Sequence, residues 1–102
     1  MVETRYPQGM LAACETPWTD QYALDEVAFR KHIGRVLELG YTNIYVMGTA
    51  GEGYAVTDAQ FRQVVDVFVE ETDRPGITPQ VGVISLSMGQ VIERLTYAHD
   101  KG

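Results

Sequence analysis

Apolar and polar positions along the chain follow two different periods, which together predict a repeating order of strand, loop and helix. Compact apolar runs predict three strands, near Gly9–Cys14, Thr42–Met47 and Gln80–Ile84. Longer stretches with apolar residues every three or four positions predict three amphipathic helices, near Asp25–Leu39, Asp58–Thr72 and Met88–Asp100. The order recurs about every 35 residues, which is typical of βα units in a barrel or a doubly wound sheet.

The predicted helices have recognisable ends and apolar faces. Thr57 with Gln60 forms a capping-box pattern before the second helix, and Ser87 with Gln90 repeats it before the third. Gly40 is predicted to follow the first helix at the C′ position. We expect the apolar stripes to pack against the sheet. They comprise Phe29, Ile33, Val36 and Leu37, then Phe61, Val64, Val65 and Phe68, then Met88, Val91, Ile92 and Leu95.

The loop Gly48–Glu52, which follows the second predicted strand, is the main candidate for a functional site. It lies between a buried strand and a helix start, so it belongs to the carboxyl end of the strand, where α/β proteins hold their ligands. Its glycines let the backbone approach a ligand and turn N–H groups outward, and Thr49 adds a hydroxyl. The loop therefore suits a small carboxylate, although glycines also occur here simply because the chain turns.

Composition and charge narrow the class of protein. A hydrophobic fraction of 45% and a charged fraction of 22% are typical of a globular domain. The formal net charge of -6 argues against binding to nucleic acid or to an anionic membrane surface. The first residues lack an apolar signal region and no apolar run approaches membrane-spanning length, so we expect a cytoplasmic protein.

The other chemically interesting side chains have simpler interpretations. The single cysteine, Cys14, cannot form an internal disulfide and is expected to be a small buried side chain. His32 and His99 fall in separate predicted helices without other ligands at metal-binding spacing, so no metal site is predicted. Glu15 is expected to face outward at a strand end rather than to act in catalysis, and Glu52 to accept N–H bonds from its own loop.

Three motifs follow one another in an order and spacing that match a known enzyme family. The first is the segment 11–18, Leu-Ala-Ala-Cys-Glu-Thr-Pro-Trp, followed by Asp20 and Leu24-Asp25. The second is the loop Gly48–Glu52, and the third is Gln80–Ser85. Together they resemble the start of the Schiff-base lyase family of dihydrodipicolinate synthase and N-acetylneuraminate lyase. The resemblance extends from about Gly9 to Gly102.

The resemblance implies a (βα)8 TIM barrel, with parallel strands inside and helices outside. Such a barrel needs roughly 250 residues, and this chain has 102. We therefore expect residues 1–102 to form the first three βα units, the amino-terminal part of a single barrel domain, and the chain to be a fragment. The family also implies a homo-oligomer, either a dimer or a tetramer, and no metal or diffusible cofactor.

The family chemistry joins an active-site lysine to pyruvate or a related 2-keto acid as an imine. Lys31 and Lys101 do not follow apolar strands, and the resemblance places the reactive lysine and its tyrosine beyond Gly102. The chain alone is thus expected to be inactive.

What the chain would supply is the cradle for the keto-acid carboxylate, made by Gly48, Thr49 and Ala50. The resemblance also gives Thr49 a catalytic role in moving a proton. Ala50 stands where relatives carry a second hydroxyl, so one side-chain hydrogen bond is absent.

Two other functions fit the same residues. One is a non-catalytic homologue or binding module that keeps the carboxylate loop without the lysine. The other is a self-contained α/β domain, or a half-barrel completed by a second chain.

Overall fold

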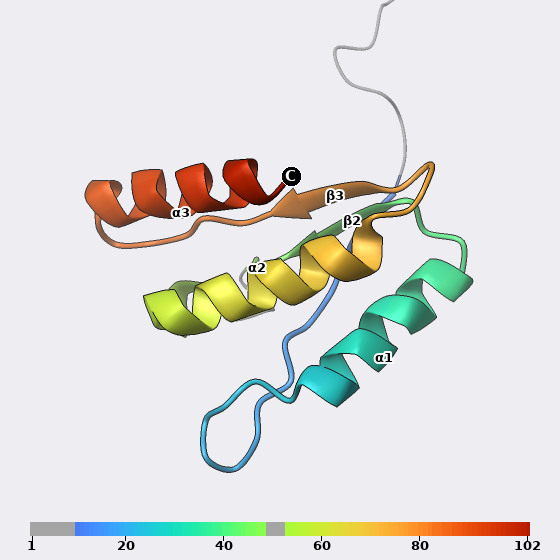
Figure 1. Cartoon of the computed structure of the whole chain (residues 1–102), viewed down its shortest axis with the longest axis horizontal. Helices are drawn as coiled ribbons and strands as arrows, with labels where there is room; N and C mark the ends of the chain where they lie inside the picture. The colour runs from blue at the N-terminus through green and yellow to red at the C-terminus, as the bar shows by residue number, and fades with distance from the viewer. Residues whose placement is uncertain (1–9, 49–52) are drawn as a thin grey trace, which may run out of the picture.

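The fold is an alternation of three strands and three α-helices in a computed structural model that describes residues 10–48 and 53–102. The strands are β1 (Leu11–Ala13), β2 (Asn43–Val46) and β3 (Thr78–Val81). The helices are α1 (Glu26–Glu38), α2 (Asp58–Thr72) and α3 (Met88–Lys101), with a short 3-10 helix, η1 (Gly53–Ala55), before α2. The three strands form one parallel sheet in the order β1-β2-β3, and α2 packs between α1 and α3 (Figure 1).

The core lies between the sheet and the helices. Ile44 and Val46 are completely buried on one face of β2, whereas Tyr45, on the opposite face, is only half-buried. The predicted stripes of α1 and α2 meet that buried face. The helix residues in this core are Phe29, Ile33, Val36, Phe61, Val64, Val65, Val67 and Phe68. The alternation along β2 thus separates a face covered by helices from a face that would line the interior of a barrel.

The helix boundaries follow the predicted signals closely. Asp25 is the N-cap of α1, and its side chain accepts a hydrogen bond from the Ala28 N–H. Gly40 follows α1 with φ of +95°, a left-handed conformation that glycine adopts without strain. Helix α2 has the predicted bounds, while α3 continues one residue further than predicted, to Lys101.

The predicted position of the third strand is wrong by two or three residues. Residues 82–84 were expected to be extended in the sheet, but β3 ends at Val81. The reason lies in its partner strand: β2 ends at Val46, and Gly82 N–H donating to the Val46 carbonyl is the last rung between them. Beyond that point Met47 turns away with φ of 64°, so Val83 and Ile84 have no strand to pair with.

The predicted burial of the apolar stripe on α3 is wrong for three of its four residues. Met88, Ile92 and Leu95 are 73%, 55% and 58% exposed, while Val91 is half-buried. In the part of the chain that the structure describes, α3 packs on α2 through its other side, with Tyr97 and Ala98 against the core. The helix is amphipathic in sequence, yet no described element covers these three apolar residues.

Candidate functional site

The carboxyl end of β2 has an unusual backbone. Met47 is fully buried and has a positive φ of 64°, which is uncommon for a residue with a side chain. Its carbonyl is enclosed by two glycines, because a Cβ at either Gly53 or Gly82 would overlap the Met47 carbonyl oxygen. Strained backbone of this kind costs about 1–3 kcal/mol and persists only where the surroundings impose it. The end of β2 is therefore held in one conformation by the loops after β2 and β3.

This conformation sets up the base of the predicted loop. Gly53 N–H donates to the Gly48 carbonyl at 3.1 Å, which brings the two ends of the loop together. Gly48 lies against the ring of Tyr45, and a Cβ at Gly48 would collide with that ring. Of the predicted site residues, Gly48 is thus at the expected place, whereas Thr49 and Ala50 lie outside the described residues, as does Glu52.

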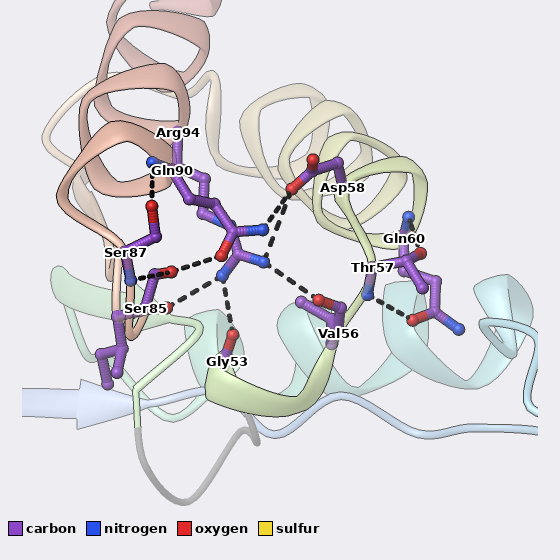
Figure 2. Close-up of polar contacts among 10 residues, drawn as sticks. Gly53, Val56, Thr57, Asp58, Gln60, Ser85, Ser87, Gln90 and Arg94 are labelled. Carbon is purple, nitrogen blue, oxygen red and sulfur yellow. Dashed lines mark hydrogen bonds and ion pairs between the residues drawn. The ribbon is translucent and has the colours of Figure 1, made fainter.

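Arg94 joins this base to the neighbouring βα unit. Its Nη1 donates to the carbonyls of Gly53 and Ile84, at 2.9 Å each, and its Nη2 donates to the Val56 carbonyl at 3.0 Å (Figure 2). The guanidinium belongs to α3, but its acceptors lie in the segment after β2 and in the segment after β3. One side chain therefore fixes two loops at the carboxyl edge of the sheet relative to each other.

A second group of polar contacts ties the start of α3 to the start of α2. Gln90 Nε2 donates to Asp58 Oδ1 at 2.8 Å, and Gln90 Oε1 accepts from the Ser85 hydroxyl (Figure 2). Ser85 also accepts from the Ser87 N–H at 3.1 Å. The segment that leads from β3 into α3 is thereby held next to the segment that leads into α2.

Among the described residues, the charge of Arg94 is only partly neutralised. The side chain is 4% exposed, and within residues 10–48 and 53–102 its Nε has no hydrogen-bond partner and its one ion pair is with Asp58, at 3.7 Å from Nη2. The guanidinium also lies over the Phe61 ring, 5.0 Å from the centroid, where the ring face favours a cation. A chain with a net charge of -6 thus places a buried positive charge at the base of the loop 48–53.

The other residues considered from the sequence lie away from this base or take structural roles. Cys14 is buried, as predicted, and desolvation by burial raises the pKa of its thiol to about 11, so it stays protonated at neutral pH. Glu15 is exposed, and its backbone N–H donates to His32 Nε2 at 3.2 Å. Lys31 is exposed, and Lys101 pairs with Asp66 at 3.5 Å on the surface, so neither sits in an apolar pocket.

Two absences hold for the described part of the chain. Among residues 10–48 and 53–102, no three His, Cys, Asp or Glu side chains come together as a metal site. Within the same ranges, no helix has the length and apolar character needed to cross a bilayer.

Sequence reasoning missed Arg94 and Met47. Arg94 was missed because arginine on an amphipathic helix is usually solvated. It lies three residues after Val91 and four before Ala98, on the side of α3 that faces α2. That position was the available signal. Met47 reads as an ordinary end of an apolar strand, and nothing in the sequence indicates its positive φ.

The comparisons with known proteins agree on one family. A sequence model described as the dihydrodipicolinate synthetase family matches residues 6–102. A 4-hydroxy-tetrahydrodipicolinate synthase of Methanopyrus kandleri is 33% identical over 97 residues, which cover 93% of this chain and 32% of that protein. An N-acetylneuraminate lyase of Shigella boydii is 30% identical over 84 residues, which cover 81% of this chain and 28% of the lyase.

Solved structures show the same likeness. The dihydrodipicolinate synthase of Acinetobacter baumannii, solved as a complex with pyruvate, matches with a TM-score of 0.84 and 25% identity. The match covers 93% of this chain and 32% of that one. The predicted fold, the first three βα units of a (βα)8 barrel, is confirmed. The chain spans about a third of the length of the relatives it matches.

Proposed function

Because the chain belongs to the dihydrodipicolinate synthetase family, we propose that it is the amino-terminal part of a lyase that links a 2-keto acid to a lysine as an imine. The relatives named above are a 4-hydroxy-tetrahydrodipicolinate synthase and an N-acetylneuraminate lyase, and one similar structure was solved with pyruvate. The reaction is an aldol condensation or cleavage, or a related dehydration. The imine serves as the electron sink, and the protein holds the substrate and moves protons.

In this proposal the loop 48–53 binds the carboxylate of the keto acid. The observation that carries it is the closed loop base, with Gly53 N–H bonded to the Gly48 carbonyl at the carboxyl end of β2. Backbone N–H groups at Thr49 and Ala50, together with the Thr49 hydroxyl, donate to the carboxylate. Thr49 also relays a proton during the reaction.

The lysine of the imine lies outside this chain in the proposal. Lys31 is exposed and Lys101 pairs with Asp66 on the surface, whereas an imine-forming lysine needs an apolar setting in which its amine can be neutral. Residues 1–102 are therefore inactive alone and contribute the carboxylate loop to a single barrel domain. A cytoplasmic location, self-association of the complete protein and the absence of nucleic-acid, membrane and cofactor binding remain predictions.

A second function is a non-catalytic homologue, or a self-associating α/β module that lacks the lysine. The exposed apolar residues Met88, Ile92 and Leu95 on α3 favour association of some kind. The two functions differ in one observable property, since only the lyase forms a reducible adduct with pyruvate.

A Thr49→Val variant of the protein encoded by the complete reading frame tests the role of the loop. Loss of a hydrogen bond to a charged group is worth about 1.5–3 kcal/mol, so the KM for pyruvate should rise roughly tenfold or more. Thr96→Val is a matched control, because Thr96 is exposed on α3 and, among the described residues, its hydroxyl bonds to the Ile92 carbonyl of its own helix. Equal KM and kcat values in Thr49→Val and wild type would contradict the proposed role.

A further inference from the structure

Gly53 is the point through which Arg94 reaches the loop 48–53. The Gly53 carbonyl accepts from Arg94 Nη1 at 2.9 Å, and the Gly53 N–H donates to the Gly48 carbonyl at 3.1 Å. Gly53 also packs so closely on the Met47 carbonyl that a Cβ there would overlap it. A movement of the guanidinium thus moves Gly53, and Gly53 cannot move without opening the base of the loop or displacing the end of β2.

The same guanidinium is anchored on the neighbouring loop. Nη1 is shared between the Gly53 carbonyl and the Ile84 carbonyl, which follows β3, and Nη2 holds the Val56 carbonyl in front of α2. The planar fork of arginine fixes the directions of these donors relative to one another, which an ammonium group on a flexible stem does not do. The guanidinium therefore helps to set the distance between the loops after β2 and β3.

The charge of Arg94 also influences the loop 48–53. Asp58 is its one ion-pair partner within the described residues, at 3.7 Å, and Asp58 is 56% exposed while Arg94 is 4% exposed. With so distant and solvated a counter-ion, the described residues leave a positive potential around the buried guanidinium. That potential favours an anionic group bound at the adjacent loop.

We infer that Arg94 is a positioning residue for the carboxylate of the substrate, acting through Gly53 and through its charge without touching the substrate. This inference rests on the proposed function of the loop. It also assigns to α3, a helix on the outside of the barrel, a part in substrate affinity.

The test compares Arg94→Met with Arg35→Met in the protein encoded by the complete reading frame. Methionine keeps an unbranched apolar stem but removes the three carbonyl contacts and the charge. Arg35 is the control because its side chain is 71% exposed and makes only a 3.7 Å pair with Glu38. We expect the KM for pyruvate to rise tenfold to roughly a hundredfold in Arg94→Met, with kcat within about threefold of wild type and no change in Arg35→Met.

A merely structural role would give a different result. Fewer folded molecules would lower the apparent kcat at an unchanged KM, and that outcome overturns the inference. Arg94→Lys separates charge from geometry, since it keeps the charge and loses the fork; we expect a KM between those of wild type and Arg94→Met. A lysine variant with the KM of wild type would overturn the positioning role of the guanidinium.

A measurement on the wild type covers the case in which the variants do not fold. Addition of pyruvate should shift the NMR resonance of the Arg94 Nε–H group and leave that of Arg35 unchanged. An unmoved Arg94 resonance at saturating pyruvate overturns the inference.

Failure of the proposed function would be recognised separately, as a wild type that neither binds pyruvate nor forms an imine. In that case amide hydrogen exchange at Gly53 still tests whether Arg94 holds the base of the loop 48–53. The exchange should be faster in Arg94→Met than in Arg35→Met, and equal rates would overturn the inference.

Discussion

The starts of α2 and α3 carry the same sequence pattern, yet their glutamines have different partners. At α2, Gln60 Oε1 accepts from the Thr57 N–H at 2.8 Å and Thr57 accepts from the Gln60 N–H at 3.1 Å, a complete capping box. At α3, Ser87 accepts from the Gln90 N–H at 3.3 Å, but the Gln90 side chain bonds to Ser85 and Asp58 instead. The pattern fixes where each helix begins, and the neighbouring unit decides what the glutamine holds.

The apolar stripes of the two helices differ in the same way. The stripe of α2 is buried between the sheet and its neighbours, whereas Met88, Ile92 and Leu95 on α3 are exposed. Polar side chains, with Arg94 among them, make much of the contact between α3 and the α2 unit. Helix α2 is thus held by apolar packing, whereas α3 depends in large part on directed polar contacts.

We expect the largest difference in stability between substitutions in the apolar stripes of α2 and α3. Phe68→Ala removes a completely buried ring from α2 and should lower the free energy of unfolding by about 3–5 kcal/mol. Leu95→Ala on α3 should change it by no more than about 0.5 kcal/mol in the 102-residue chain, because Leu95 is 58% exposed. Urea unfolding followed by the fluorescence of the single tryptophan, Trp18, measures both. Comparable losses of stability at the two positions would show that α2 and α3 are held by apolar packing to the same extent.

The next effect lies at Gly53, where α3 reaches the loop before α2. Gly53→Ala forces a Cβ into the Met47 carbonyl, and we expect a loss of about 1–3 kcal/mol in the free energy of unfolding. Gly34→Ala is the control, because a Cβ at Gly34 in α1 meets nothing within 4 Å. That change should stabilise by about 0.5–1 kcal/mol, as alanine is the better helix former. A Gly53→Ala protein as stable as wild type would contradict the crowded base.

Double-mutant cycles measure how differently the two glutamines, Gln90 and Gln60, are coupled to Asp58. Substituting Gln90 and Asp58 by alanine, singly and together, should give a coupling free energy of about 1 kcal/mol, because their side chains are hydrogen-bonded at 2.8 Å. The same cycle for Gln60 and Asp58 should give a value near zero, since residues two apart on a helix do not face each other. Equal coupling in both cycles would show that Gln90 does not join the two units.

The smallest effect is a pH dependence at the far end of α3. Tyr97 donates to Asp66 Oδ1 at 2.6 Å, and burial followed by this hydrogen bond raises the pKa of Tyr97 above its ordinary value of 10.0. A raised pKa in the folded state means that the stabilisation is complete below pH 10.0 and is lost as the pH rises through the folded value.

Urea midpoints measured across that alkaline range test this sign. Tyr97→Phe keeps the edge contact with Phe61 but cannot titrate, so its midpoint should fall less than that of wild type. Identical pH profiles for the two proteins would mean that Tyr97 does not link α3 to α2 in this way.

Most of the fold could be predicted because it depends on local signals. Asp25, Gly40 and Thr57 each mark a helix end through contacts with residues a few positions away. The end of β3 could not be predicted, because it is set by Met47, which directly follows another strand. The exposure of Leu95 escaped prediction for a similar reason, since periodicity shows which face of a helix is apolar but not what covers it.

The candidate site likewise has a part that could be predicted from local signals and a part that could not. The position of Gly48 at the end of β2 followed from the order of strand, loop and helix. The role of Arg94 could not be predicted from that order, because its three carbonyl acceptors come from residues 10 to 41 positions away in sequence. The roles of Thr49 and Ala50 stay predictions, as these residues lie outside the described part of the chain.

The most direct test is the intact mass of the protein encoded by the complete reading frame, after incubation with pyruvate and borohydride. We expect one reduced pyruvyl adduct on each chain of the complete protein, and none on the 11.4 kDa chain of 102 residues, whose two lysines lie on its surface. A complete protein that stays unmodified at saturating pyruvate, or an adduct on Lys31 or Lys101, would contradict it.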